Sequence, residues 1–165
     1  MKKAAITLEW MGKNMIRRVY VDTSVIGGQF DKEFDWQTEP FWSAVRRRDI
    51  TIIVSDILRG KMMGAPSHVR AFFDDLLLLP VEYVQLTSEA GDLAGKYISE
   101  KVVGESCLDD ARHIAMATLA RADVLVSWNF KHIVNVGRIR AYNSVHLRLG
   151  YLMIENQNTS GGGGL

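Results

Sequence analysis

Four short runs of β-branched and aromatic residues alternate with longer segments in which apolar residues recur at helical spacing. The runs are residues 19–21, 51–54, 81–85 and 123–127. Runs of this length and composition predict strands, and the periodic segments between them predict amphipathic helices. Strands that alternate with helices are typical of an α/β fold, in which helices cover both faces of a central, mostly parallel sheet. We expect the third run to form an edge strand of that sheet.

The pattern also suggests how the chain ends and where its domain lies. Residues 133–149 are expected to form two short helices, and residues 151–154 are a candidate for a last edge strand. A length of 165 residues suits one domain with a sizeable core. We place this domain at residues 16–155, with residues 1–15 as an N-terminal extension. Residues 156–165, which hold four consecutive glycines, are expected to form a flexible tail.

The composition argues against several classes of protein. The formal net charge is +1, so no field of the whole molecule draws the chain to nucleic acid, and any such contact depends on local patches. A single cysteine, Cys107, permits no internal disulfide and favours a reducing compartment. No apolar run approaches the roughly 20 residues that span a bilayer, and Glu9 interrupts the short apolar stretch at the start. We therefore expect a cytoplasmic protein with no membrane partner.

Polar side chains gather where the predicted strands end. Residues 22–24 follow the first strand, residues 55–56 the second and residues 127–129 the fourth. Because crossovers between parallel strands are right-handed, these loops emerge at one edge of the sheet, where open α/β sheets bind their ligands. Asp22 is the central residue of this edge. Its carboxylate either caps the next helix, or it holds a cation or moves a proton.

Three stretches, taken together, resemble one known family. They are Tyr20–Gly28, Leu108–Ala117 and Leu125–Asn135, and their order and spacing fit the family across residues 17–150. In these stretches the chain is similar to PIN domains, and most of all to the VapC-like toxins of bacterial toxin–antitoxin pairs. The resemblance implies a PIN-like three-layer sandwich over residues 16–155 and an endoribonuclease that depends on Mg²⁺ or Mn²⁺. It also implies RNA as the substrate, a cognate antitoxin as a partner and a homodimer.

The resemblance assigns roles to individual residues. Asp22 stands at the first acidic position of the family and Asp110 at the third, so both are expected to bind the metal ion directly. Asn129 stands at the fourth position, usually an aspartate, and is expected to act through a bound water. Ser24 is expected to orient a ligand or to bind phosphate. Oxygen atoms from these residues suit hard divalent cations, which prefer oxygen ligands.

Two adjacent aspartates begin the helix that carries the second motif. With Ser106 as the N-cap, Asp109 has the spacing of the reciprocal residue of a capping box. Asp110 points about 100° further around the helix and shares a face with His113. We therefore interpret Asp110 as the metal ligand. Asp109 either caps the helix or assists the site without binding the metal directly. His113 is expected to be a packed residue that supports the site.

Lys61 occupies the second acidic position of the family. A change from carboxylate to ammonium alters the local charge by two units. Two unit charges about 4 Å apart interact by roughly 4 kcal/mol at an effective dielectric of about 20. Three outcomes are open. Lys61 replaces the charge of the metal and silences or weakens the site, or Asp56 substitutes as a ligand, or Lys61 points outward and the remaining acids hold the metal loosely. We favour the first outcome.

Two other functions compete with the ribonuclease. In the first, the chain is a catalytically silent PIN-like protein that binds an antitoxin or RNA, and Lys61 is the feature that favours it. In the second, the chain is a phosphatase of the haloacid dehalogenase type, which also places an aspartate after a strand. That chemistry requires a second aspartate two residues later, where this chain has Ser24. We rank the phosphatase far behind the other two.

Overall fold

The computed structural model of the protein describes residues 17–28, 30, 35–127 and 136–154. The expected N-terminal extension (1–15), the expected tail (156–165) and Asn129 all lie outside these residues. The expectations for these parts of the chain therefore stay predictions.

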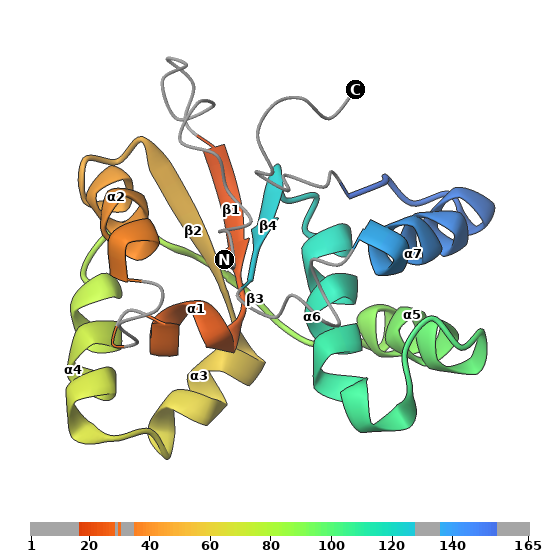
Figure 1. Cartoon of the computed structure of the whole chain (residues 1–165), viewed down its shortest axis with the longest axis horizontal. Coiled ribbons are helices and arrows are strands. Elements are labelled where there is room, and N and C mark those ends of the chain that lie inside the picture. The colour runs from red at the N-terminus through yellow and green to blue at the C-terminus, as the bar shows by residue number, and fades with distance from the viewer. Residues whose placement is uncertain (1–16, 29, 31–34, 128–135, 155–165) are drawn as a thin grey trace.

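A four-stranded parallel sheet forms the centre of the fold (Figure 1). Its strands are β1 (Arg17–Val21), β2 (Ile50–Ser55), β3 (Glu82–Val84) and β4 (Val124–Val126). Their order across the sheet is β3-β2-β1-β4, and each of these neighbouring pairs is parallel. β1 lies between two strands, with Val19 opposite Ile52 on one side and opposite Val124 on the other. The sheet confirms the predicted α/β class and the edge position of the third strand.

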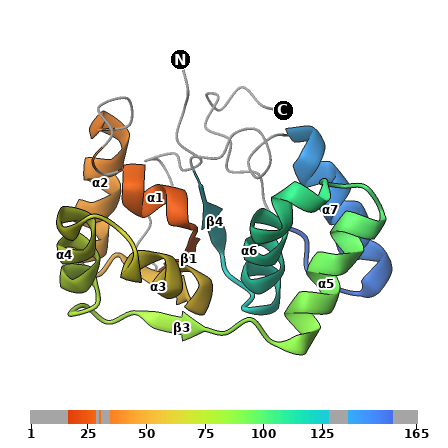
Figure 2. The same cartoon turned by 90° about the horizontal axis from the view of Figure 1, so that it is seen from below.

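Helices cover both faces of the sheet, as the two views in Figure 1 and Figure 2 show. One face carries α1 (Thr23–Gly28), α2 (Asp35–Arg46), α3 (Asp56–Met63) and α4 (Ser67–Leu76). The other face carries α5 (Ser88–Ser99), α6 (Leu108–Leu119) and α7 (Val136–Leu149), with a 3-10 turn (Glu105–Cys107) that leads into α6. This is the three-layer sandwich that the sequence predicted. Within the described residues, no helix combines the length and the apolar character needed to cross a membrane.

Alternation of side chains along the strands divides the core into two parts. Val19 and Val21 are buried against α1 to α4, whereas Tyr20 between them is buried against α5 to α7. The same alternation sends Ile52 of β2 to the first part and Ile53 to the second. Strands buried on both faces need apolar residues at successive positions, which explains the continuous apolar runs in the sequence.

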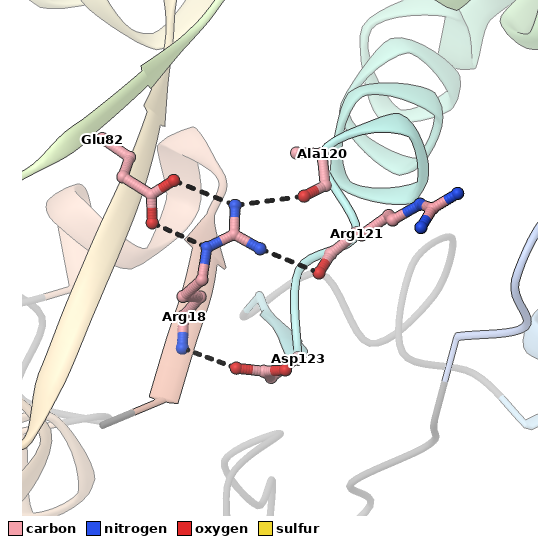
Figure 3. Close-up of polar contacts among 5 residues, drawn as sticks. All are labelled: Arg18, Glu82, Ala120, Arg121 and Asp123. Atoms are coloured by element: carbon pink, nitrogen blue, oxygen red, sulfur yellow. Dashed lines mark hydrogen bonds and ion pairs between the residues drawn. The ribbon is translucent and has the colours of Figure 1, made fainter. Parts of the chain in front are cut away.

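Arg18 of β1 ties the sheet to the end of α6 (Figure 3). Its guanidinium forms a bidentate ion pair with Glu82 of β3, with N–O distances of 2.7 and 2.9 Å. It also donates to the backbone carbonyls of Ala120 and Arg121, at 3.1 and 3.0 Å. The backbone N–H of Arg18 donates to the Asp123 carboxylate at 2.8 Å. Because the last carbonyls of a helix have no partner inside it, this cation fixes the C-terminal end of α6.

Two expectations for the end of the chain are wrong. Residues 151–154 form no strand. Instead, the side-chain amide of Asn143 in α7 accepts from the N–H of Ile154 at 2.8 Å and donates to the Ile154 carbonyl at 2.9 Å. An amide that satisfies both backbone groups replaces the hydrogen bonds of a strand ladder. The described part of the segment expected to hold two short helices is one helix, α7.

Candidate metal centre

Asp22 lies at the carboxyl end of the central strand β1, directly before α1. It is 3% exposed. Its Oδ1 accepts a hydrogen bond from the Ser24 hydroxyl and its Oδ2 accepts one from the Ser127 hydroxyl, both at 2.6 Å. Ser127 reaches Asp22 because β4 pairs with β1 in a register that sets Val126 opposite Val21. Hydroxyls from two neighbouring strand ends therefore orient both carboxylate oxygens.

Burial makes the Asp22 carboxyl group a weaker acid than an exposed aspartate. Its removal from water has the largest effect and raises its pKa to about 6, against the opposing hydrogen bonds from Ser127 and Ser24. The negative charge of Asp110 raises the pKa further. A buried carboxylate beside a second acid, at the ligand-binding edge of a parallel sheet, is typical of a functional site. A divalent cation bound nearby would relieve both the desolvation and the repulsion.

The structure brings Asp110 into the neighbourhood of Asp22. Asp110 lies in the first turn of α6, and its charge adds to the rise in pKa that burial causes at Asp22. Burial and then the same charge raise the pKa of Tyr142 in α7. Two of the three predicted metal ligands are therefore near enough for their charges to interact, while Asn129 lies outside the described residues. Their role as ligands stays a prediction.

Asp109 does not cap α6, so the predicted capping box is wrong. The N-cap of α6 is Cys107, with no side-chain cap, because Ser106 belongs to the preceding 3-10 turn and the helix starts one residue later than expected. The Asp109 carboxylate instead lies between two cations. Its Oδ2 is 2.9 Å from Lys61 Nζ, and its Oδ1 accepts from Arg112 at 3.3 Å. The hydrogen bond from Lys61 is the main cause of the lowered pKa of Asp109.

Lys61 and Asp56 of α3 were the two alternatives for the second acidic position. Lys61 lies in the last turn of α3, is about half exposed and pairs with Asp109, the residue before Asp110. The Asp56 carboxylate accepts from the backbone N–H of Leu86, at 3.2 Å for Oδ1 and 3.1 Å for Oδ2. This bond links the start of α3 to the segment between β3 and α5.

His113 forms a buried link between α6 and β1. It is 2% exposed, its Nδ1 lies 2.6 Å from the Tyr20 hydroxyl, and its Nε2 lies 3.5 Å from the Thr23 hydroxyl. Burial and then the positive charge of Lys61 lower its pKa to about 4, so the imidazole is neutral at pH 7. A neutral imidazole donates one hydrogen bond and accepts another. The prediction that His113 is a packed helix residue is confirmed, and its contact with Tyr20 joins α6 to β1.

The residues present fit a hard divalent cation through a reduced set of ligands. Asp22 and Asp110 supply two carboxylates that repel each other, and such a pair gains from a cation. The part of the chain that the structure describes holds no group of three His, Cys, Asp or Glu side chains arranged for a metal ion. Lys61, which the resemblance aligns with a third carboxylate, pairs instead with Asp109. We therefore expect Mg²⁺ or Mn²⁺ to bind more weakly than in a site with three carboxylates.

Two residues bond to site residues in ways that the sequence did not predict. Ser127 was placed at the correct edge, but its bond to Asp22 was not foreseen. The available signal was a hydroxyl residue directly after a strand that neighbours the strand of Asp22. Tyr20 was treated as a strand residue only, although a buried tyrosine hydroxyl needs a partner, which here is His113.

Comparison with known proteins supports the fold. No protein-family model and no curated protein matches the sequence. Among solved structures, the chain is similar to a chain in the crystal structure of VapBC2 from Rickettsia felis bound to a DNA fragment from their promoter. The match covers 69% of this chain and 89% of that chain, with a TM-score of 0.50 and 16% sequence identity. At this identity the similarity shows the fold alone, and it agrees with the predicted PIN-like sandwich.

Proposed function

We propose that this protein is a metal-dependent endoribonuclease of the PIN type and the toxin of a toxin–antitoxin pair, with activity weakened by Lys61. The observation that carries the proposal is the environment of Asp22. This buried carboxylate ends the central strand, accepts two hydroxyl hydrogen bonds, and has a pKa raised by burial and by the charge of Asp110. Such an arrangement is costly for the fold and suits a cation at the ligand-binding edge.

Each residue of the site has a distinct task in the proposed reaction. Asp22 and Asp110 bind the cation directly, and Asn129 acts through a water. Ser24 and Ser127 hold the two oxygens of Asp22, so that the carboxylate presents one fixed orientation. When bound, Mg²⁺ or Mn²⁺ supplies Lewis-acid activation of a water molecule and neutralises charge on the scissile phosphate.

The proposed partners follow from the same assignment. The structurally similar VapBC2 was crystallised with a DNA fragment from the promoter of its own pair. We extend this likeness to three proposals for this chain: a cognate antitoxin binds it, RNA is its substrate, and it assembles as a homodimer. Co-expression with the neighbouring open reading frame, followed by purification and mass measurement, tests the antitoxin and the dimer together.

Lys61 lowers the attraction of the site for a cation. Its ammonium neutralises Asp109 at 2.9 Å and places positive charge beside the helix turn that carries Asp110. Lys61→Glu reverses the charge and adds an oxygen ligand at the second acidic position. We expect Mn²⁺ affinity and the rate of RNA cleavage to rise together, by about tenfold or more, in this variant.

RNA digestion with Mn²⁺ tests the proposal on the wild-type chain, Lys61→Glu, and each of these combined with Asp110→Asn. We expect Asp110→Asn to abolish cleavage in both backgrounds, since it removes a direct ligand. Arg121→Glu is a matched control, because it makes the same charge change on an exposed residue just beyond the other end of α6. Strong wild-type cleavage that Lys61→Glu leaves unchanged would show that Lys61 does not stand at the second acidic position. Absence of cleavage by the wild-type chain and by Lys61→Glu refutes the nuclease.

The ion pair of Lys61 also favours a second candidate function, a catalytically silent PIN-like protein that binds an antitoxin or RNA. Lys61 already neutralises part of the site, and the described residues hold no three-ligand group. Calorimetry with Mn²⁺ separates the two functions. Heat of binding at millimolar Mn²⁺ with the wild-type chain supports the nuclease, whereas heat with Lys61→Glu alone supports the silent protein.

A further inference from the structure

Three charged side chains from α3 and α6 meet next to Asp110, which follows Asp109 in the first turn of α6. Lys61 Nζ lies 2.9 Å from Asp109 Oδ2, and Arg112 Nη1 donates to Asp109 Oδ1 at 3.3 Å. The exposed fractions of the three side chains are 46% for Lys61, 45% for Asp109 and 35% for Arg112. Solvent, and therefore a ligand, reaches this Lys61–Asp109–Arg112 cluster.

The cluster sets two cations against one carboxylate, so one positive charge remains uncompensated within it. Ion pairs between side chains this exposed add little to stability. The two cations therefore lose little when they exchange Asp109 for another anion.

A phosphodiester is the anion that matches the place of the Asp109 carboxylate. Both carry one negative charge and present two oxygens, and each oxygen of Asp109 already meets a different cation. Lysine and arginine form strong, charge-assisted hydrogen bonds to phosphate oxygens. The exposed ends of Lys61 and Arg112 need only to rotate to exchange one anion for the other.

The cluster borders the proposed cleavage site. Asp109 directly precedes Asp110, the proposed metal ligand of α6, and both residues lie in the first turn of that helix. The other cation of α3, Arg59, lies elsewhere, over the ring of Tyr83 at 5.0 Å from its centroid. Lys61 is therefore the cation that α3 directs to this border.

We propose that Lys61 and Arg112 form a phosphodiester-binding subsite for single-stranded RNA, which the Asp109 carboxylate occupies when RNA is absent. The identity of the ligand as RNA rests on the proposed function, whereas the subsite itself requires no metal. Lys61 then has a task of its own: it lowers the affinity of the site for a cation and raises its affinity for the RNA backbone. The protein consequently binds RNA without divalent ions.

Fluorescence anisotropy with a labelled single-stranded RNA, in EDTA and about 50 mM salt, tests the subsite. We expect Lys61→Met and Arg112→Met each to weaken binding about threefold to tenfold, and to lower the slope of log Kd against log salt by roughly 0.7. Asp109→Asn removes the competing carboxylate and is expected to strengthen binding about threefold or more. Arg121→Met removes one positive charge beyond the far end of α6 and leaves binding unchanged.

The gain expected for Asp109→Asn guards against misfolding, since an unfolded variant cannot mimic tighter specific binding. Unchanged binding in Lys61→Met and Arg112→Met, or weaker binding in Asp109→Asn, would overturn the subsite and leave the cluster as a structural ion pair. The nuclease proposal fails separately. It fails if RNA binds as expected in EDTA while neither the wild-type chain nor Lys61→Glu cleaves it with Mn²⁺.

Discussion

Asp22 loses its hydration on folding, and the hydroxyls of Ser24 and Ser127 compensate for only part of that loss. Its pKa rises from 3.8 to about 6. A raised carboxyl pKa means that the folded state disfavours the charged form. At about 1.4 kcal/mol per pKa unit, the penalty is about 3 kcal/mol, fully present above pH 6 and lost as the pH falls toward 3.8.

Asp22→Asn is therefore expected to raise the free energy of unfolding by about 2–3 kcal/mol at pH 7.5 in EDTA, because the amide carries no charge. The advantage shrinks at pH 4.5, where the wild-type carboxyl is protonated in the folded state. Urea denaturation at the two pH values measures both effects. Added Mn²⁺ should stabilise the wild-type chain and not the variant. A variant less stable than wild type at pH 7.5 would show that the hydroxyl hydrogen bonds outweigh the desolvation.

α6 is the element whose placement decides the geometry of the site. Its first turn carries Asp110, its middle is joined to β1 by the bond between His113 and Tyr20, and its end is held by Arg18. A helix fixed at several points along its length cannot tilt freely. The distance between the two acids therefore depends on contacts far from the acids themselves.

Arg18→Met is expected to lower the free energy of unfolding by roughly 1–2 kcal/mol. It should also speed amide exchange in the last turn of α6, because the carbonyls of Ala120 and Arg121 lose their donor. Arg18→Lys keeps the charge but lacks the forked geometry and should recover less than half of the loss. Hydrogen exchange by mass spectrometry measures the local effect, with α5 as the internal reference. Equal acceleration in α5 would indicate a loss of global stability alone.

At the scale of the whole molecule, much of the architecture could be predicted from the sequence because the chain follows simple periodicities. Apolar runs located the four strands, and the polar residues after them located the strand end that holds Asp22. Asp110, in the first turn of α6, is near enough to Asp22 for their charges to interact. The prediction of a strand at residues 151–154 is wrong. Their apolar composition suits a strand, but the N–H and carbonyl of Ile154 bond to the Asn143 side chain instead. Periodicity carries no information on which distant side chain satisfies a backbone group.

The contacts that give the site its electrostatics could not be predicted for a related reason. The bond of Ser127 to Asp22 depends on β4 being the neighbour of β1, and the pair of Lys61 with Asp109 depends on the approach of α3 to α6. Neither proximity is encoded in a local pattern. The prediction that Asp109 caps α6 is wrong because a 3-10 turn moves the start of α6 by one residue. Capping rules do not anticipate this shift.

The stability of the whole molecule against pH combines titrations of opposite sign. Burial lowers the pKa of His113 and of His146 to about 4, so the folded state favours the neutral imidazoles. A histidine with a lowered pKa contributes stability above pH 6.5 that is lost as the pH falls toward 4. Asp22 acts in the opposite sense, because its penalty disappears as the pH falls below 6.

Between pH 7 and pH 5, each histidine is expected to remove about 2 kcal/mol from the free energy of unfolding and Asp22 to restore about 1 kcal/mol. We therefore expect the protein in EDTA to be about 2–3 kcal/mol less stable at pH 5, measured by urea denaturation. In Asp22→Asn the loss should grow by about 1 kcal/mol, because the compensating carboxyl is absent. Stability that stays level or rises toward pH 5 would mean that His113 and His146 accept protons within the fold, which their burial against Tyr20 and Tyr97 opposes.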